Sequence, residues 1–203
     1  MYVHARVFKY KFSTKGERKL NYAVIKKNDI ANGPGVRVSL FVSGCRHRCK
    51  NCFNSQAWDF SYGEKYTEKT QNEILKALSP DYVEGLSLLG GEPFERENAA
   101  VLSELALIFK REFPNKTIWA YSGFLFEDLI SGAQGDDAKR LLETVDVLVD
   151  GKFIEELKSE ALLFRGSSNQ RIIDVQKSVE SGSPVILEGK WERTMGSGDI
   201  YEF

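Results

Sequence analysis

Four apolar segments of this chain are each followed by a short polar segment that contains glycine. The polar segments read SGC at residues 43–45, GGEP at 90–93, YSG at 121–123 and DGK at 150–152. Stretches with the apolar spacing of helices separate them. Strands that alternate with helices predict a parallel sheet with helices packed outside it. Such sheets bind ligands at the carboxyl ends of their strands, so the four polar segments are expected to meet at one rim.

The elements of this α/β fold follow from apolar periodicity. Strands are expected over residues 36–42, 83–89, 117–121 and 145–149. Helices are expected after an N-cap at Thr67, over roughly residues 97–112, and around residues 138–142.

The two ends of the chain stand apart from this alternating pattern. Residues 1–26 alternate apolar and polar side chains and predict an N-terminal β-hairpin extension, with its turn at residues 13–16. A core domain is expected over residues 27–175. Residues 176–203 form a C-terminal tail whose order the sequence leaves open.

Composition limits the class of protein. The 203 residues are 42% hydrophobic and carry a formal net charge of -1, as in an ordinary globular domain. This balance gives no broad electrostatic reason to expect nucleic acid or a membrane as partner. The N-terminal residues lack the apolar core of a signal peptide, and no stretch has transmembrane length. A cytoplasmic location is therefore expected.

The cysteines of the chain are all found in one loop. Cys45, Cys49 and Cys52 have the spacing C-x3-C-x2-C, directly after the expected strand 36–42. Three thiolates can hold a cubane iron–sulfur cluster and leave one iron open to another molecule. Zinc with His47 or His4 as a fourth ligand is an alternative, but Cys3His zinc sites usually draw on two separated ligand pairs.

The GGEP segment is the second informative motif. Gly90 and Gly91 let the backbone approach a ligand closely, and Glu92 adds a carboxylate beside them. Taken alone, this motif is equally typical of a strand-to-helix turn with an acidic residue at the helix start. Its place about forty residues after a three-cysteine motif favours a ligand site.

On these motifs the chain resembles the radical S-adenosylmethionine (SAM) enzymes. Within that superfamily it is similar to the activating proteins of anaerobic ribonucleoside-triphosphate reductases. The resemblance runs from about residue 28 to residue 174 and implies a partial (βα)6-type TIM-like barrel. The segments that carry it are DIANGPGVRVSLFVSGC (29–45), CRHRCKNCFN (45–54), LLGGEP (88–93), IWAYSGF (118–124), VDVLVDGKF (145–153) and FRGSSNQRIIDV (164–175).

The resemblance also implies roles for individual residues. Cys45, Cys49 and Cys52 would be the catalytic cysteines that ligate three irons of a [4Fe–4S] cluster, with SAM on the fourth iron. Phe53 would lie against the adenine, since an aromatic ring suits a flat apolar base. The full set expected to bind the cofactor is Asn51, Cys52, Phe53, Gly90, Gly91 and Glu92 (the last three at the methionyl ammonium), Ser122 near the ribose, and Asp150 and Lys152 toward the SAM carboxylate.

The activity implied by the resemblance is the activation of another enzyme. The reduced cluster would cleave SAM to a 5′-deoxyadenosyl radical, which would take a hydrogen from a glycine of the reductase large subunit. A flavodoxin or ferredoxin would be the electron donor. Alternatives are an activase of the pyruvate formate-lyase type, a small-molecule radical SAM enzyme, and a non-catalytic zinc or iron–sulfur module.

Several basic residues have more than one interpretation. Arg46, Arg48 and Lys50 could favour thiolates and a reduced cluster, contact an acidic electron donor, or be solvated loop residues. Arg37 and Arg165 are candidates for an interior network or for a partner contact.

Overall fold

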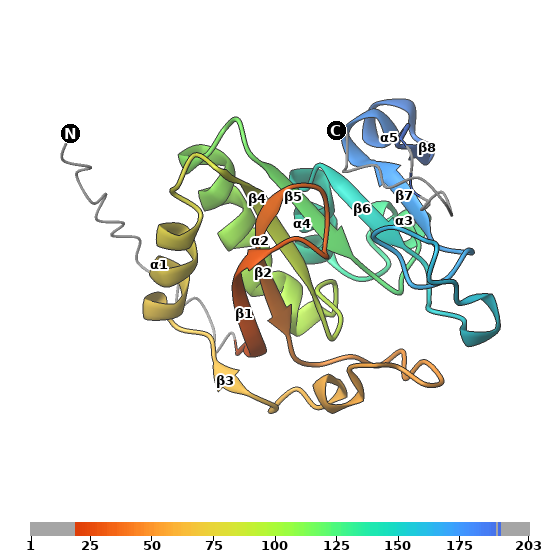
Figure 1. The fold of residues 1–203 in the computed structure, drawn as a ribbon, viewed down its shortest axis with the longest axis horizontal. Coiled ribbons are helices and arrows are strands. Elements are labelled where there is room, and N and C mark those ends of the chain that lie inside the picture. The colour runs from red at the N-terminus through yellow and green to blue at the C-terminus, as the bar shows by residue number, and fades with distance from the viewer. Residues whose placement is uncertain (1–18, 190, 192–203) are drawn as a thin grey trace.

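The computed structural model describes residues 19–189 and 191. In this part of the chain eight strands form one mixed sheet, in the order β3-β1-β2-β4-β5-β6-β7-β8 (Figure 1). The strands are β1 (Asn21–Asp29), β2 (Val36–Val42), β3 (Glu64–Lys65), β4 (Val83–Gly90), β5 (Thr117–Tyr121), β6 (Val147–Asp150), β7 (Arg171–Asp174) and β8 (Val185–Ile186). The α-helices are α1 (Glu68–Ala77), α2 (Arg96–Glu112), α3 (Phe126–Ile130), α4 (Asp136–Thr144) and α5 (Val175–Ser181), and the 3-10 helices are η1 (Ser55–Trp58) and η2 (Glu155–Leu157).

The centre of the sheet is parallel, as the alternating pattern predicts. Strands β2, β4, β5 and β6 run parallel to one another, whereas β1, β3, β7 and β8 pair antiparallel at the two sides. Strands β2 and β5 have the predicted bounds, and the other predicted strands and helices are found within a few residues. The α/β fold class is therefore confirmed.

The core lies between the sheet and its helices. Alternate side chains of a strand point to opposite faces, so Val38, Leu40 and Val42 of β2 share one face. There they join a cluster with side chains of α1, α2 and α4, which cover that face (Figure 1). The opposite face carries a smaller aromatic cluster around Trp119, with Phe164 and Trp191 in edge contact with its ring.

The predicted N-terminal hairpin falls largely outside the described residues. Its turn and its first strand belong to residues 1–18, while its second strand is part of β1, which continues to Asp29 and pairs with β2. In the predicted C-terminal tail, α5 and β8 are regular elements, and residues 192–203 lie beyond the described part. No helix in the described residues is long and apolar enough to cross a membrane.

Helix α1 begins at the predicted N-cap. The Thr67 hydroxyl accepts a hydrogen bond from the Thr70 backbone N–H at 3.3 Å, and the Thr67 N–H donates to the Thr70 hydroxyl at 3.2 Å. This reciprocal capping box satisfies two backbone donors at the helix start.

Replacement of this cap is expected to destabilise the fold modestly. Thr67→Ala removes the acceptor for the Thr70 N–H, so the free energy of unfolding should fall by about 1 kcal/mol in urea denaturation. Lys69→Ala, an exposed change in the same turn, should alter it by less than about 0.5 kcal/mol. Equal effects of the two changes would show that the cap contributes nothing.

Candidate active site

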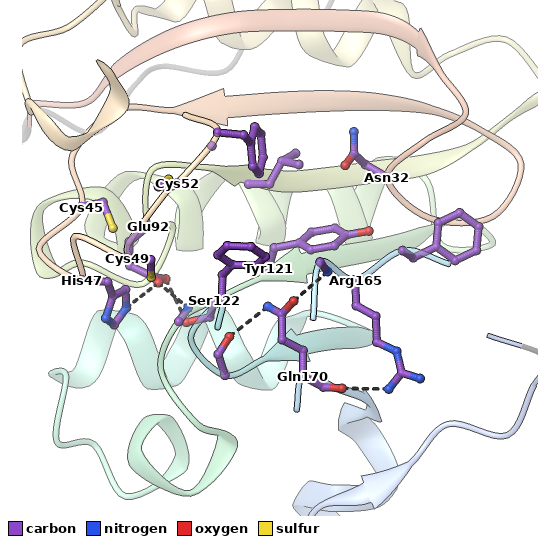
Figure 2. A pocket seen from close by; sticks show the side chains of 18 of the residues that line it. Asn32, Cys45, His47, Cys49, Cys52, Glu92, Tyr121, Ser122, Arg165 and Gln170 are labelled. Atoms are coloured by element: carbon purple, nitrogen blue, oxygen red, sulfur yellow. Dashed lines mark hydrogen bonds and ion pairs between the residues drawn. The ribbon is translucent and has the colours of Figure 1, made fainter. Parts of the chain in front are cut away.

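A cavity of about 650 Å³ opens at the carboxyl ends of β2, β4, β5 and β6 (Figure 2). All four polar segments predicted to meet there contribute to its wall. The contributing residues are Cys45, Cys49 and Cys52, then Gly90, Gly91 and Glu92, then Tyr121, Ser122 and Gly123, and Gly151. Other parts of the wall come from Leu89, from His47, Asn51, Phe53 and Trp58 in and after the cysteine loop, and from Ile30, Ala31 and Asn32 before β2. The β6–β7 connection adds further residues, among them Phe153, Glu155, Leu162, Phe164, Arg165 and Gln170.

Backbone hydrogen bonds join the start of the cysteine loop to the GGEP segment. The Gly91 N–H donates to the Val42 carbonyl at 2.7 Å, and the Glu92 N–H donates to the Gly44 carbonyl at 2.9 Å. The Asn98 side chain in α2 donates to the carbonyls of Ser43, Gly44 and Glu92. These bonds hold the ends of β2 and β4 together and fix the start of the cysteine loop, at Ser43 and Gly44, against the GGEP segment.

The three cysteines are partly exposed and form no disulfide. Burial, and to a smaller extent the nearby carboxylates of Glu92 and Glu95, raise the pKa of the Cys45 thiol to about 12. Burial also raises the pKa of the Cys49 thiol. The surroundings of Cys45 and Cys49 therefore favour the thiol over the thiolate.

Two of the three basic residues of the loop, Arg46 and Lys50, are used in ion pairs, and the Arg48 guanidinium lies 6.0 Å from the centre of the Trp58 ring. Arg46 pairs with Glu95 and Glu97, and Lys50 lies 3.1 Å from the Glu156 carboxylate. Their positive charge is offset by these carboxylates.

The donor set fits an iron–sulfur cluster better than a zinc ion. No three His, Cys, Asp or Glu side chains of the described residues are grouped as ligands of a single metal ion. The thiolates of a cubane bind different irons and stand farther apart than the ligands of one ion. His47 Nε2 lies 2.9 Å from the Glu92 carboxylate, so this nitrogen is already engaged. The other candidate zinc ligand, His4, lies outside the described residues.

Glu92 is the most highly connected side chain of the rim. It is 1% exposed. One carboxylate oxygen accepts from the Phe94 N–H and the Ser122 hydroxyl, at 3.0 and 2.9 Å. The other accepts from the Gly123 N–H at 2.7 Å and faces His47 Nε2 at 2.9 Å (Figure 2). Glu92 thus ties the ends of β4 and β5 to the cysteine loop.

The other residues predicted to bind the cofactor differ in how far their side chains are free to meet a ligand in the cavity. Phe53 lines the cavity and is 90% exposed, which leaves its ring free for an aromatic base. Asn51 also lines the cavity, with a left-handed backbone (φ 52°) and its side-chain amide on Glu155. Ser122 lines the cavity, but its hydroxyl is bonded to Glu92.

Asp150 and Lys152 are not among the residues that line the cavity. The Asp150 carboxylate is fully buried, pairs with the Arg171 guanidinium, and accepts from the Phe126 N–H at 2.8 Å. The Lys152 carbonyl accepts from the Asn169 side chain at 2.9 Å. Asp150 therefore holds β7 and the start of α3 against the end of β6, and Gly151 is the member of DGK that reaches the cavity.

Comparison with known proteins identifies the family. Residues 31–173 match the family described as a 4Fe-4S single cluster domain. The chain is 41% identical to the anaerobic ribonucleoside-triphosphate reductase-activating protein of Vibrio cholerae, over 75% of this chain and 97% of that protein. It is 40% identical to the protein of the same name from Enterobacteria phage T4, over 75% of this chain and 93% of that protein. It is 37% identical to the protein of the same name from Escherichia coli K12, over 74% of this chain and 96% of that protein. The chain belongs to the family of anaerobic ribonucleoside-triphosphate reductase-activating proteins.

The match to the 4Fe-4S single cluster domain supports an iron–sulfur cluster in this chain, and the three cysteines lie inside the matched residues. Sequence reasoning missed three contributors to the site in this region: Asn98, Gln170, and His47 as a partner of Glu92. Gln170 bonds the N–H groups of Gly166 and Ser167 and the Gly151 carbonyl, which closes the RGSSNQ segment onto the end of β6. The sequence signal for Gln170 was its place in the RGSSNQ segment, which carries part of the resemblance to the family. No signal in the sequence pointed to Asn98.

Proposed function

We infer that the protein is a radical SAM activase, which installs a glycyl radical on the large subunit of an anaerobic ribonucleoside-triphosphate reductase. The observation that carries this proposal is the meeting of three thiols with the GGEP and YSG segments around one cavity. Cys45, Cys49 and Cys52 would hold a [4Fe–4S] cluster. Bound there and reduced, the cluster would supply one electron to SAM, which would give methionine and a 5′-deoxyadenosyl radical able to take a hydrogen atom from the acceptor glycine.

The cavity suits SAM in size and lining. About 650 Å³ is within the range of small-molecule sites. Phe53 offers an aromatic face for the adenine, and the backbone at Gly90 and Gly91 can approach the methionyl end closely. The Glu92 carboxylate already accepts from four protein groups, so we assign it to holding the rim. Asp150 is assigned a similar indirect role through Arg171.

A macromolecular partner fits the open side of the site. We assign the sheet to a partial barrel, in which the parallel strands β2, β4, β5 and β6 surround the cavity on one side only. Ile30 and Phe53 line the cavity and remain 73% and 90% exposed. An exposed apolar margin is suited to a protein segment that carries the acceptor glycine. The electron donor is assigned to the flavodoxin or ferredoxin class by resemblance to the family.

The test is anaerobic reconstitution with iron and sulfide, followed by SAM and a strong reductant. We expect 5′-deoxyadenosine and methionine, and a glycyl radical signal by electron paramagnetic resonance when an anaerobic ribonucleoside-triphosphate reductase is added. Pyruvate formate-lyase in its place should give no radical. An intact cluster that yields no 5′-deoxyadenosine rejects the proposal, and a radical on pyruvate formate-lyase alone assigns a different partner.

A further inference from the structure

One of the groups that donate a hydrogen bond to the Glu92 carboxylate does not belong to the rim. An ionised carboxylate offers about four acceptor positions. Three are occupied by the Phe94 N–H, the Ser122 hydroxyl and the Gly123 N–H, all at the ends of β4 and β5. The fourth group is His47 Nε2, from the middle of the cysteine loop. Because an ionised carboxylate only accepts, His47 is the donor in this pair.

The imidazole of His47 occupies a fitted slot at the end of β5. Its ring lies edge-on to the Phe124 ring, with the centroids 4.4 Å apart. A Cβ atom at Gly123 would lie 2.4 Å from the His47 ring, so the slot exists only because residue 123 has no side chain. Ring packing and the hydrogen bond together set one orientation for His47.

This contact differs from the other side-chain anchors of the loop. The side chains of His47 and Glu92 are 8% and 1% exposed, whereas Arg46 and Lys50 are 58% and 72% exposed in their ion pairs. Exposed ion pairs contribute little because water screens them. Hydrogen bonds to a buried charge are stronger, and their loss leaves the charge with an unmet acceptor. His47 is therefore a buried side-chain connection between the middle of the cysteine loop and the rim, in addition to the hydrogen bonds that Asn98 makes at the start of the loop.

On the proposed function, SAM must reach from the cluster at one end to the rim near Gly90 and Gly91 at the other. We propose that His47 is a positioning residue that sets the spacing of these two ends through Glu92. It touches neither the cluster nor SAM in this role. Cluster assembly needs the three thiols and is retained without His47, while a ligand that spans both ends is held less tightly.

The test compares His47→Ala and His47→Gln with the unaltered protein, all reconstituted anaerobically with iron and sulfide. Iron and sulfide content and visible absorbance report the cluster, and calorimetric titration with SAM reports the dissociation constant. For His47→Ala we expect a normal cluster content and a dissociation constant raised about 10–100-fold, as for other residues that orient a ligand's partners. His47→Gln, whose amide can donate to Glu92, should bind SAM more tightly than His47→Ala.

Ser103→Ala is the matched control, because it removes the hydrogen bond that Arg140 of α4 donates to the buried Ser103 of α2, away from the cavity. It should bind SAM as the unaltered protein does. The proposal is overturned if His47→Ala with a full cluster binds SAM normally, or if both His47 variants lose the cluster. Failure of the unaltered, cluster-loaded protein to bind SAM counts instead against the proposed function.

Discussion

Cys49→Ala is expected to abolish both the visible absorbance of the cluster and the cleavage of SAM. Two thiolates remain in the variant, and the chain has no further cysteine to replace the third. The loss should be complete rather than graded, because a cubane with two protein ligands has no stable attachment. Absorbance spectra, iron content and 5′-deoxyadenosine assays after anaerobic reconstitution measure the three consequences.

A folded but cluster-free variant is the informative outcome. Ser178→Ala is the matched control, since it also removes one small polar atom, on α5 and away from the cavity. It should keep the cluster and the activity. If Cys49→Ala retains SAM cleavage with a normal iron content, Cys49 is not a ligand and the assignment of the three-cysteine site is wrong.

Arg37→Leu is expected to produce the largest loss of stability. Arg37 lies in β2, is 1% exposed, and donates to the Ser87 hydroxyl at 2.8 Å and to the carbonyls of Leu86 and Thr117 at 2.9 and 2.8 Å. Burial lowers the pKa of its guanidinium to about 10, which leaves it charged at neutral pH. Leucine has no group that can donate to these buried acceptors and leaves them without these hydrogen bonds, so the free energy of unfolding should fall by about 3 kcal/mol or more.

Urea denaturation measures this loss, with Arg140→Leu as the control. The Arg140 side chain is 45% exposed in its ion pair with Asp137, and its removal should cost less than about 1 kcal/mol. Ser87 also donates to the Asn32 carbonyl at 2.6 Å, so Arg37→Leu should loosen the cavity wall at residues 30–32 and speed its proteolysis. Equal losses for the two arginines would contradict an interior role for Arg37.

The regular elements were predictable where apolar periodicity was strong. Strands β2 and β5 are short and mostly buried, and their sequences contain little that competes with a strand. Helix α3 has only five residues, and β7 follows a connection of twenty residues without a parallel crossover, so neither has a distinctive local pattern. The antiparallel strands β7 and β8 therefore became visible only in the folded sheet.

The chain's sequence by itself determined which segments share the rim and to which family the protein belongs. Both follow from local patterns: the cysteine spacing, and strands of one direction that end in glycine-rich segments. The tertiary structure decided the partners of the polar side chains. Glu92 was predicted to meet an ammonium, and the fold gives its carboxylate the protein partners His47, Ser122 and Gly123, while Asp150 is held by Arg171. Such pairings connect residues 21 to 45 positions apart, so they depend on how the strands lie together and have no periodic trace in the sequence.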